Sequence, residues 1–447
     1  MFLSIIALAS CLYLRSMTLL FTFLFNFITS DTINLQQHLT SSEFYEERVA
    51  SKNVKGFNEI LKKHAGKSIV FKLPVGKVWI NASIFIPDHT TIAGDNSGSE
   101  ISIGNASGNF TEGILVNDDY SLGNAKMNHN ISLVNFTING NGLDRGDKFV
   151  RGVFFNKVSN VVIHKLSVIN TTQEGIRVDV NNLSAISENI EISECFVSRR
   201  NYKDANIIVR SIMNDGANSA FWPSKVKNIV IRNNFSEGGV YGICLSNVTN
   251  VQAYNNTCIS NFWRGIIVSP TCADILIKNN RIDSAGSTGI HIAYYGKNVI
   301  IDSNTVSITL QDMSGKGYEG QGIKCYVGFS NLTITNNSSY NNATDGIAIE
   351  GGADGRKFLI ENNTVNNNKR NGIRLLSGPF VINKGGNIRD GKIKNNTATG
   401  NQMDAFSFTT EDKKYTIEGV TLSNNKLVNK KGYKKVNVAN GIKIFKL

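Results

Sequence analysis

The feature that most constrains the fold is a repeat of about 24 residues that runs through most of the chain. Each repeat holds a short apolar segment, a pair of Asn residues, a turn, a Gly-Ile step and a second apolar segment. The Gly of Gly-Ile recurs at positions 242, 265, 289, 322, 346 and 372, and the second Asn of the pair recurs at 234, 256, 280, 304, 337, 363, 396 and 425. A period of this length is typical of a solenoid or a propeller.

The residue pattern within each repeat decides between these two architectures. The apolar segments are short, rich in Ile and Val, and alternate with period two, which indicates strands. Three short strands make one coil, and coils stacked about 4.8 Å apart pair their strands in parallel. An Asn at the same turn of each coil can then hydrogen-bond to its counterpart in the next coil. A propeller blade needs about 40–45 residues. We therefore predict an all-β fold, a single-stranded right-handed parallel β-helix with Asn ladders.

The regions outside the repeat predict the rest of the organisation. We expect the β-helix domain to span residues 66–430, after an N-terminal segment (31–65) whose amphipathic stretch 43–64 forms a short helix that caps the open core. Residues 431–447 are predicted to form a C-terminal cap. Residues 2–29 are almost wholly apolar, so 1–30 is predicted to be a signal peptide or a single membrane anchor. This predicts a secreted, periplasmic or cell-surface protein whose membrane contact is limited to that segment.

The net charge indicates which kind of binding partner to expect, and the cysteine spacing indicates what role the cysteines have. Lys and Arg number 47 against 35 Asp and Glu, a net charge of +12, which suits an acidic polymer. We expect an acidic polysaccharide, and we expect no nucleic acid, because an export leader and an Asn-rich solenoid give it no support. The five cysteines beyond the leader show no metal-type or disulfide-type spacing, so we expect small buried side chains: Cys195, Cys244, Cys258, Cys272 and Cys325.

The repeat resembles the pectin-lyase-like superfamily of right-handed parallel β-helix proteins. The resemblance covers residues 66–430 and includes IVFKLPVGKVWINASIFIPDHTTIAGD (69–95) and FTINGNGLDRG (136–146). It implies a polysaccharide lyase, a glycoside hydrolase or a uronate epimerase, although phage tailspikes and adhesins share the fold.

Three departures from the family patterns leave the subfamily open. The polygalacturonase pattern needs an Asp pair where this chain has Lys369-Arg370-Asn371-Gly372. The Asp-Pro-His motif of mannuronan C5-epimerases is missing, and so is the clustered Asp calcium site of pectate lyases. The cofactor is therefore open, with Ca²⁺ as a candidate that no specific motif supports. Asp144 and Asp147 are candidates for a cation site, but a Gly/Asn/Asp turn explains them better.

The strand after each Gly-Ile predicts which side chains face outward. The Ile points into the core, so the next residue and the residue two further on form two outward columns. The first column is Arg177, Ile208, Cys244, Ile267, His291, Lys324, Ala348 and Arg374, and the second is Asp179, Arg210, Ser246, Ser269, Ala293, Tyr326, Glu350 and Leu376. We expect His291, Lys324, Tyr326, Glu350 and Arg374 to share one solvent-facing groove.

The chemistry of these residues suits a lyase or an epimerase acting on uronates. Such an enzyme needs a cation for the carboxylate and a base for the C5 proton. Two cationic groups on adjacent coils, His291 and Lys324, lower each other's pKa and so favour general-base use. Tyr326 or Tyr294 can act as the acid at the leaving oxygen. The predicted catalytic residues are His291, Lys324, Tyr326 and Glu350, and the predicted substrate-binding residues are Arg177, Asp179, Arg210, Tyr294 and Arg374.

Two other functions fit the same pattern. A glycoside hydrolase needs two facing carboxylates, and Asp345 with Glu350 is the acidic pair on one strand. A non-catalytic glycan-binding or surface protein, with a role in polysaccharide assembly, would use the same groove, and outward residues are often simply solvated. Long insertions at 198–226, 307–321 and 376–389 are expected to flank the groove and to offer sugar-stacking rings: Phe221, Trp222, Trp263 and Tyr318. The basic run 429–437 is predicted to be a solvated cap, with glycan contact as the alternative.

Overall fold

The computed structural model describes residues 31–95, 98–104, 108–121, 126–142, 150–181, 185–199, 204–211, 224–310, 319–351, 355–378, 386–439, 442 and 444–446. In these residues the chain forms three long parallel sheets, a short 3-10 helix, η1 (Leu35–Gln37), and one α-helix, α2 (Glu47–Lys63). Both the predicted signal or anchor segment and the pair Asp144 and Asp147 lie outside the described residues.

From β2 onward, the strands of each sheet recur at every third place in the chain order. Sheet 1 contains β1 (Asp31–Asn34), β2 (Ile69–Lys72), β5 (Thr90–Ala93), β8 (Asn128–Val134), β11 (Val158–His164), β14 (Ser187–Ser193), β17 (Val226–Arg232), β20 (Val248–Tyr254), β23 (Ala273–Lys278), β26 (Gly296–Asp302), β29 (Phe329–Thr335), β32 (Gly355–Glu361), β35 (Ile388–Lys394), β38 (Ile417–Ser423) and β41 (Ile444–Lys446). Sheet 2 contains β4 (Ile84–Ile86), β7 (Gly113–Asn117), β10 (Arg151–Asn156), β13 (Ile176–Val180), β16 (Ile207–Ser211), β19 (Tyr241–Ser246), β22 (Arg264–Val268), β25 (Ile290–Ala293), β28 (Ile323–Tyr326), β31 (Ile347–Gly351), β34 (Ile373–Ser377), β37 (Phe406–Thr410) and β40 (Val436–Val438). Sheet 3 contains β3 (Gly76–Ile80), β6 (Ser99–Ile103), β9 (Thr137–Asn139), β12 (Ser167–Ile169), β15 (Phe196–Arg199), β18 (Phe235–Gly238), β21 (Thr257–Ile259), β24 (Arg281–Asp283), β27 (Thr305–Ser307), β30 (Ser338–Tyr340), β33 (Thr364–Asn366), β36 (Thr397–Thr399) and β39 (Lys426–Val428).

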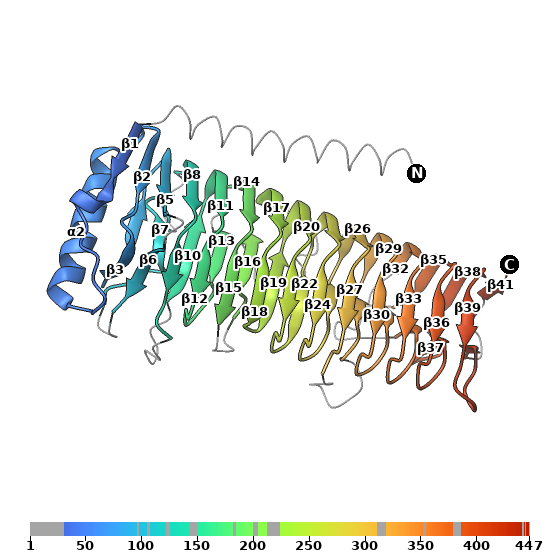
Figure 1. Cartoon of the computed structure of the whole chain (residues 1–447). Helices are drawn as coiled ribbons and strands as arrows, with labels where there is room; N and C mark the ends of the chain where they lie inside the picture. The colour runs from blue at the N-terminus through green and yellow to red at the C-terminus, as the bar shows by residue number, and fades with distance from the viewer. Residues whose placement is uncertain are drawn as a thin grey trace.

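This order makes the chain a right-handed parallel β-helix, as predicted. Each strand pairs in parallel with the strand one coil earlier and one coil later, so the coils stack along one axis (Figure 1). The register is regular: in sheet 2, Ile290 pairs with Ile323 and Ile323 with Ile347. A residue in one coil therefore lies beside its counterpart in the next.

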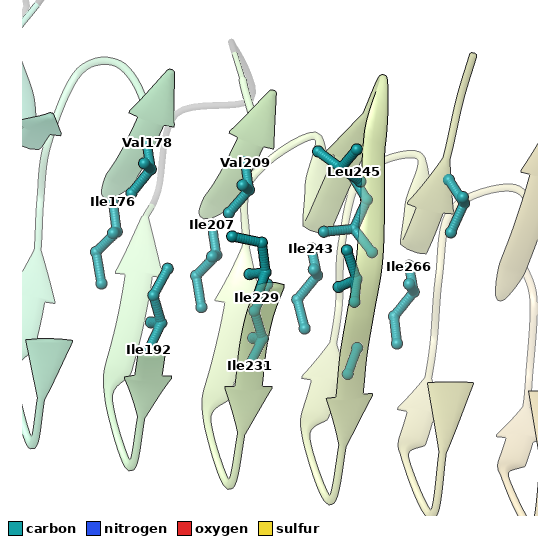
Figure 2. Packing of buried hydrophobic residues seen from close by; sticks show 14 of the residues in the cluster. Ile176, Val178, Ile192, Ile207, Val209, Ile229, Ile231, Ile243, Leu245 and Ile266 are labelled. Atoms are coloured by element: carbon teal, nitrogen blue, oxygen red, sulfur yellow. The ribbon is translucent and has the colours of Figure 1, made fainter. Parts of the chain in front are cut away.

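The core is one continuous column of inward side chains. Ile176, Ile207, Ile243 and Ile266 follow one another from coil to coil and are fully buried (Figure 2). The Gly of the Gly-Ile step has a steric cause: a Cβ on Gly372 would lie 2.6 Å from the carbonyl oxygen of Ala405 in the next coil. The five cysteines of the described residues are free and buried, as expected.

The Asn ladder is also confirmed. Each side chain except the last donates from Nδ2 to Oδ1 of its counterpart in the next coil at 2.9–3.0 Å, through the set Asn234, Asn256, Asn280, Asn304, Asn337, Asn363, Asn396 and Asn425. The same amides donate to backbone carbonyls, for example from Asn280 to Ala253 at 2.9 Å. The ladder satisfies polar groups that would otherwise be buried without partners.

The two ends of the stack differ. α2 lies at the N-terminal end (Figure 1) and buries Phe57, Ile60 and Leu61 against the first coils, as expected for a cap. β39, β40 and β41 are the last described strands of their sheets. The sheets extend beyond the expected 66–430 domain, since β1 precedes it and β40 and β41 follow it. No helix among the described residues is long and apolar enough to cross a membrane.

Candidate functional site

The outward columns of sheet 2 are where the alternation places them. His291 pairs with Lys324, Lys324 with Ala348, and Ala348 with Arg374. Tyr326 pairs with Glu350 in the second column. None of these side chains belongs to the main core, whereas the residues that alternate with them, such as Ile323 and Cys325, do.

The prediction that these side chains face solvent is wrong for four of the five. His291 and Arg374 are 4% exposed, Lys324 is 3% exposed and Glu350 is fully buried, while Tyr326 is half-buried. Strand alternation decides which face of a sheet a side chain takes, but it does not decide whether neighbouring side chains and loops cover that face. The candidate site is therefore a buried polar cluster on the outer face of sheet 2.

Four charged groups in this cluster form one ion-pair chain. Lys324 Nζ lies 3.0 Å from Glu350 Oε2, and a guanidinium nitrogen of Arg374 donates to Glu350 Oε1. Arg374 Nε lies 2.8 Å from Asp345 Oδ2, and Asp345 Oδ1 accepts the backbone and side-chain N–H groups of Asn371 at 3.0 and 2.8 Å. Two cations and two carboxylates thus balance in formal charge, and the three contacts fix their positions.

His291 is the exception in this cluster because neither ring nitrogen has a hydrogen-bond partner among the residues that the structure describes. Burial lowers the pKa of His291 well below its ordinary value, and repulsion from Arg264 and then Lys324 lowers it further. The ring is therefore neutral near pH 7. Its ring centroid lies 6.2 Å from that of Tyr326, whose own ring centroid is 5.0 Å from Lys324 Nζ.

Tyr326 and Tyr294 form the aromatic side of the site. Their rings make an edge contact with centroids 5.7 Å apart. Burial raises the pKa of the Tyr326 hydroxyl, and the nearby Tyr294 and Glu350 add to the effect. The Tyr326 hydroxyl accordingly keeps its proton at neutral pH.

Three predicted substrate-binding residues lie elsewhere. Arg177, Asp179 and Arg210 belong to β13 and β16, and β13 is four strand spacings from β25, about 19 Å. Arg177 contacts both Asp179 and Glu174, with Arg177 Nη1 to Glu174 Oε1 at 2.8 Å, and Arg210 Nε lies 3.1 Å from Asp179 Oδ2. Arg177 and Asp179 are buried. These residues form a second ion-pair network and do not share a site with His291.

Sequence reasoning missed several charged residues beside the two columns. Arg264 is 7% exposed, and its guanidinium carbon lies 3.9 Å from the ring centroid of Trp263. Glu319 joins them, with Oε2 2.8 Å from Trp263 Nε1 and Oε1 3.0 Å from Arg264 Nη2. Arg264 and Glu174 directly precede the Gly of their coil, as the already named Asp345 does, so a third outward column could have been read from the sequence. Glu319 comes from a long insertion and had no such signal.

The described residues contain no group of three or more His, Cys, Asp or Glu side chains that could hold a metal ion. The candidate cation pair Asp144 and Asp147, and the candidate stacking residues Phe221, Trp222 and Tyr318, lie outside these residues. Trp263, the remaining candidate stacking residue, is half-buried and packs against Tyr241 with ring centroids 5.7 Å apart.

Comparisons with known proteins address the fold. A family described as a right handed beta helix region matches residues 200–309 and 230–388. The A-module of the mannuronan C-5 epimerase AlgE4 of Azotobacter vinelandii is 13% identical, with a TM-score of 0.54 over 91% of this chain and all of that one. PfbA, a surface adhesin of Streptococcus pneumoniae, is 15% identical, with a TM-score of 0.57 over 86% of this chain and 93% of that one.

A third solved structure is the exopolygalacturonase of Thermotoga maritima, which is 11% identical, with a TM-score of 0.53 over 88% of this chain and 91% of that one. No curated protein matches the chain in sequence. Enzymes and an adhesin thus share the same backbone arrangement, so the likeness carries the fold and no single activity. The chain has the fold of a right-handed parallel β-helix.

Proposed function

We propose that the protein is a carbohydrate-active enzyme that acts on an acidic polysaccharide by removing the C5 proton of a uronate, as a lyase or an epimerase does. The observation that carries this proposal is the state of His291. A buried, neutral imidazole with no hydrogen-bond partner on either nitrogen retains a lone pair that can accept a proton. The nearby cations make the ring a weaker base, but they also keep it neutral, which is the form that can accept a proton.

The other groups have roles that follow from their contacts. His291 takes the C5 proton, and the electron pair of the C–H bond moves toward the carboxylate carbon. In a lyase this pair forms the C4=C5 double bond while the C4–O bond breaks, and Tyr326 gives its proton to the leaving oxygen. In an epimerase a proton returns to C5 from the opposite face. Lys324 is placed to stabilise the charge that develops on the uronate carboxylate.

Glu350 and Arg374 act in this proposal through Lys324. Glu350 holds the ammonium of Lys324 on one oxygen and the guanidinium of Arg374 on the other, so both are positioning residues. A hydrolase would need Asp345 or Glu350 as a general acid. Because Arg374 engages both carboxylates and Lys324 also engages Glu350, neither carboxylate is available for that role, which disfavours hydrolysis.

The test is an activity panel. The purified protein is incubated with polygalacturonate, polymannuronate (mannuronan) and polyguluronate. Mannuronan is included because an epimerase of the same fold is named for it. Ultraviolet absorbance of the unsaturated product reports a lyase, proton NMR of C5 inversion reports an epimerase, and new reducing ends without unsaturation report a hydrolase. Turnover that His291→Gln abolishes supports the proposal. Binding without any turnover would instead make the protein a non-catalytic glycan-binding protein. Export from the cytoplasm, expected from residues 1–30, is part of this proposal.

A further inference from the structure

The turn between β39 and β40 carries a concentrated positive charge. We call residues 429–435 the basic turn, since four of its seven residues are lysines, and all four are exposed: Lys430, Lys431, Lys434 and Lys435. Tyr433 lies among them and is 45% exposed. Lys434 Nζ lies 3.5 Å from Asn437 Oδ1, and none of the four ammonium groups is ion-paired within the described residues.

The backbone of the basic turn is held in place without using these side chains. The carbonyl of Lys434 accepts the N–H of Ala405 at 3.3 Å, and the carbonyl of Lys435 accepts the N–H of Phe406 at 3.1 Å. Asp404 Oδ1 accepts the backbone N–H of Lys434 at 3.0 Å. The lysines are therefore presented from a hydrogen-bonded backbone, and Tyr433 lies between the two lysine pairs in the sequence.

The basic turn is also in line with the candidate site. It leads into β40, which belongs to sheet 2, two strand spacings from Arg374 on β34 and five from His291 on β25, or about 10 and 24 Å. Exposed Lys369 occupies the corresponding turn before β34. A polymer that lies along the helix axis over sheet 2 passes these turns after it leaves the site.

We propose that the basic turn is an accessory binding site for an anionic polysaccharide, which holds the polymer while sheet 2 acts on it. Four exposed ammonium groups, none of them ion-paired within the described residues, attract a chain with a carboxylate on every sugar, and an exposed ring offers an apolar face for a sugar ring. This inference rests on the substrate class proposed above, but not on turnover. The N-terminal cap also has exposed lysines, yet Glu46, Glu47 and Glu59 lie among them, so its charge is mixed.

The experiment compares two variants with the same loss of net charge. One carries Lys430→Gln, Lys431→Gln, Lys434→Gln and Lys435→Gln; the matched control carries the same change at exposed lysines of the cap region: Lys52, Lys62, Lys63 and Lys67. Isothermal titration with polygalacturonate and alginate at physiological ionic strength should show about tenfold weaker binding for the first variant and less than about twofold for the second. Added salt should weaken wild-type binding more than that of the first variant.

Each other result has a definite meaning. Equal losses in both variants, or no loss in either, would refute the accessory site. Lysine-dependent partitioning onto vesicles of anionic phospholipid, with polyuronate binding unchanged, would replace the polysaccharide with a membrane surface. A protein that binds through the four lysines yet never turns over refutes only the proposed function. Circular dichroism checks folding, and Tyr433→Ala, expected to weaken binding about threefold, provides a second variant.

Discussion

Replacing Glu350 by Gln should destabilise the protein by about 3–5 kcal/mol. Glu350 is fully buried and neutralises both Lys324 and Arg374. Removing its charge leaves the buried Lys324 ammonium without its carboxylate, and breaking a buried pair in this way costs about 3–5 kcal/mol. Arg374 keeps Asp345 at 2.8 Å, so it retains a carboxylate after the substitution.

The matched control is Glu361→Gln. Glu361 Oε1 lies 2.9 Å from Lys394 Nζ, also across neighbouring strands, but the two side chains are 21% and 38% exposed. An ion pair that water reaches contributes about 0–1 kcal/mol. The same chemical change should therefore cost less than about 1 kcal/mol at this position.

Urea denaturation followed by both circular dichroism and tryptophan fluorescence measures these losses. The two probes must give the same midpoint before a free energy is assigned, because stacked repeats can unfold in parts. Adding Lys324→Met to Glu350→Gln should recover at least about 1 kcal/mol, since it removes the cation that lost its partner. A loss below 0.5 kcal/mol for Glu350→Gln, the size typical of surface changes, would refute the buried network.

Three further predictions test the site, the ladder and the cap. The pKa of His291 is lowered in the fold, so if His291 is the base, turnover should persist below pH 6.5, where an ordinary histidine is mostly protonated. The stability that its neutral form contributes is complete above about pH 6.5. Below that pH the free energy of unfolding should fall by up to about 1.4 kcal/mol per pH unit, because the histidine takes up a proton in the unfolded chain but not in the fold. His291→Gln should abolish turnover at every pH and flatten the stability profile, and an unchanged stability profile would show that the ring is solvated. Asn280→Ala should cost about 2–5 kcal/mol in urea denaturation, because it leaves the carbonyl of Ala253 and the N–H of Asn256 buried without partners, whereas Asn366→Ala on the half-buried face of sheet 3 should cost less than about 1 kcal/mol. Phe57→Ala should cost about 3–5 kcal/mol and increase light scattering on storage, since it loosens the helix that covers the first coils; a change below 1 kcal/mol would mean that the helix is not a cap.

The fold could be predicted from the sequence because key residues of the solenoid recur at the regular spacing of its coils. The Asn positions from 234 to 425 lie in the ladder, and the residues after Gly-Ile fall into the expected columns, because each coil repeats the environment of the previous one. The repeat alone therefore predicted the strand register, the face that each side chain takes and the position of each turn, without any knowledge of contacts between distant residues.

The state of the site residues could not be predicted in the same way. Lys324 points outward from sheet 2, as the alternation of the strand predicts, yet Glu350 and Tyr326 cover it. The alternation gives the direction of a side chain but carries no information on how far neighbouring side chains reach. Glu319 reaches Trp263 and Arg264 from an insertion that has no place in the repeat. Burial on the outer face depends on such long side chains and insertions, which a pattern of alternation does not describe.

The order of the stack is also the order of synthesis. The cap helix α2 and the first coils are made first, and every later strand pairs with a strand that the ribosome has already released. Each newly finished coil therefore presents three unpaired strand edges, and these edges are protected only when the following coil adds to them. A pause in translation would hold such an edge open to other chains, so the rate at which coils are delivered sets how long the growing protein is exposed to aggregation.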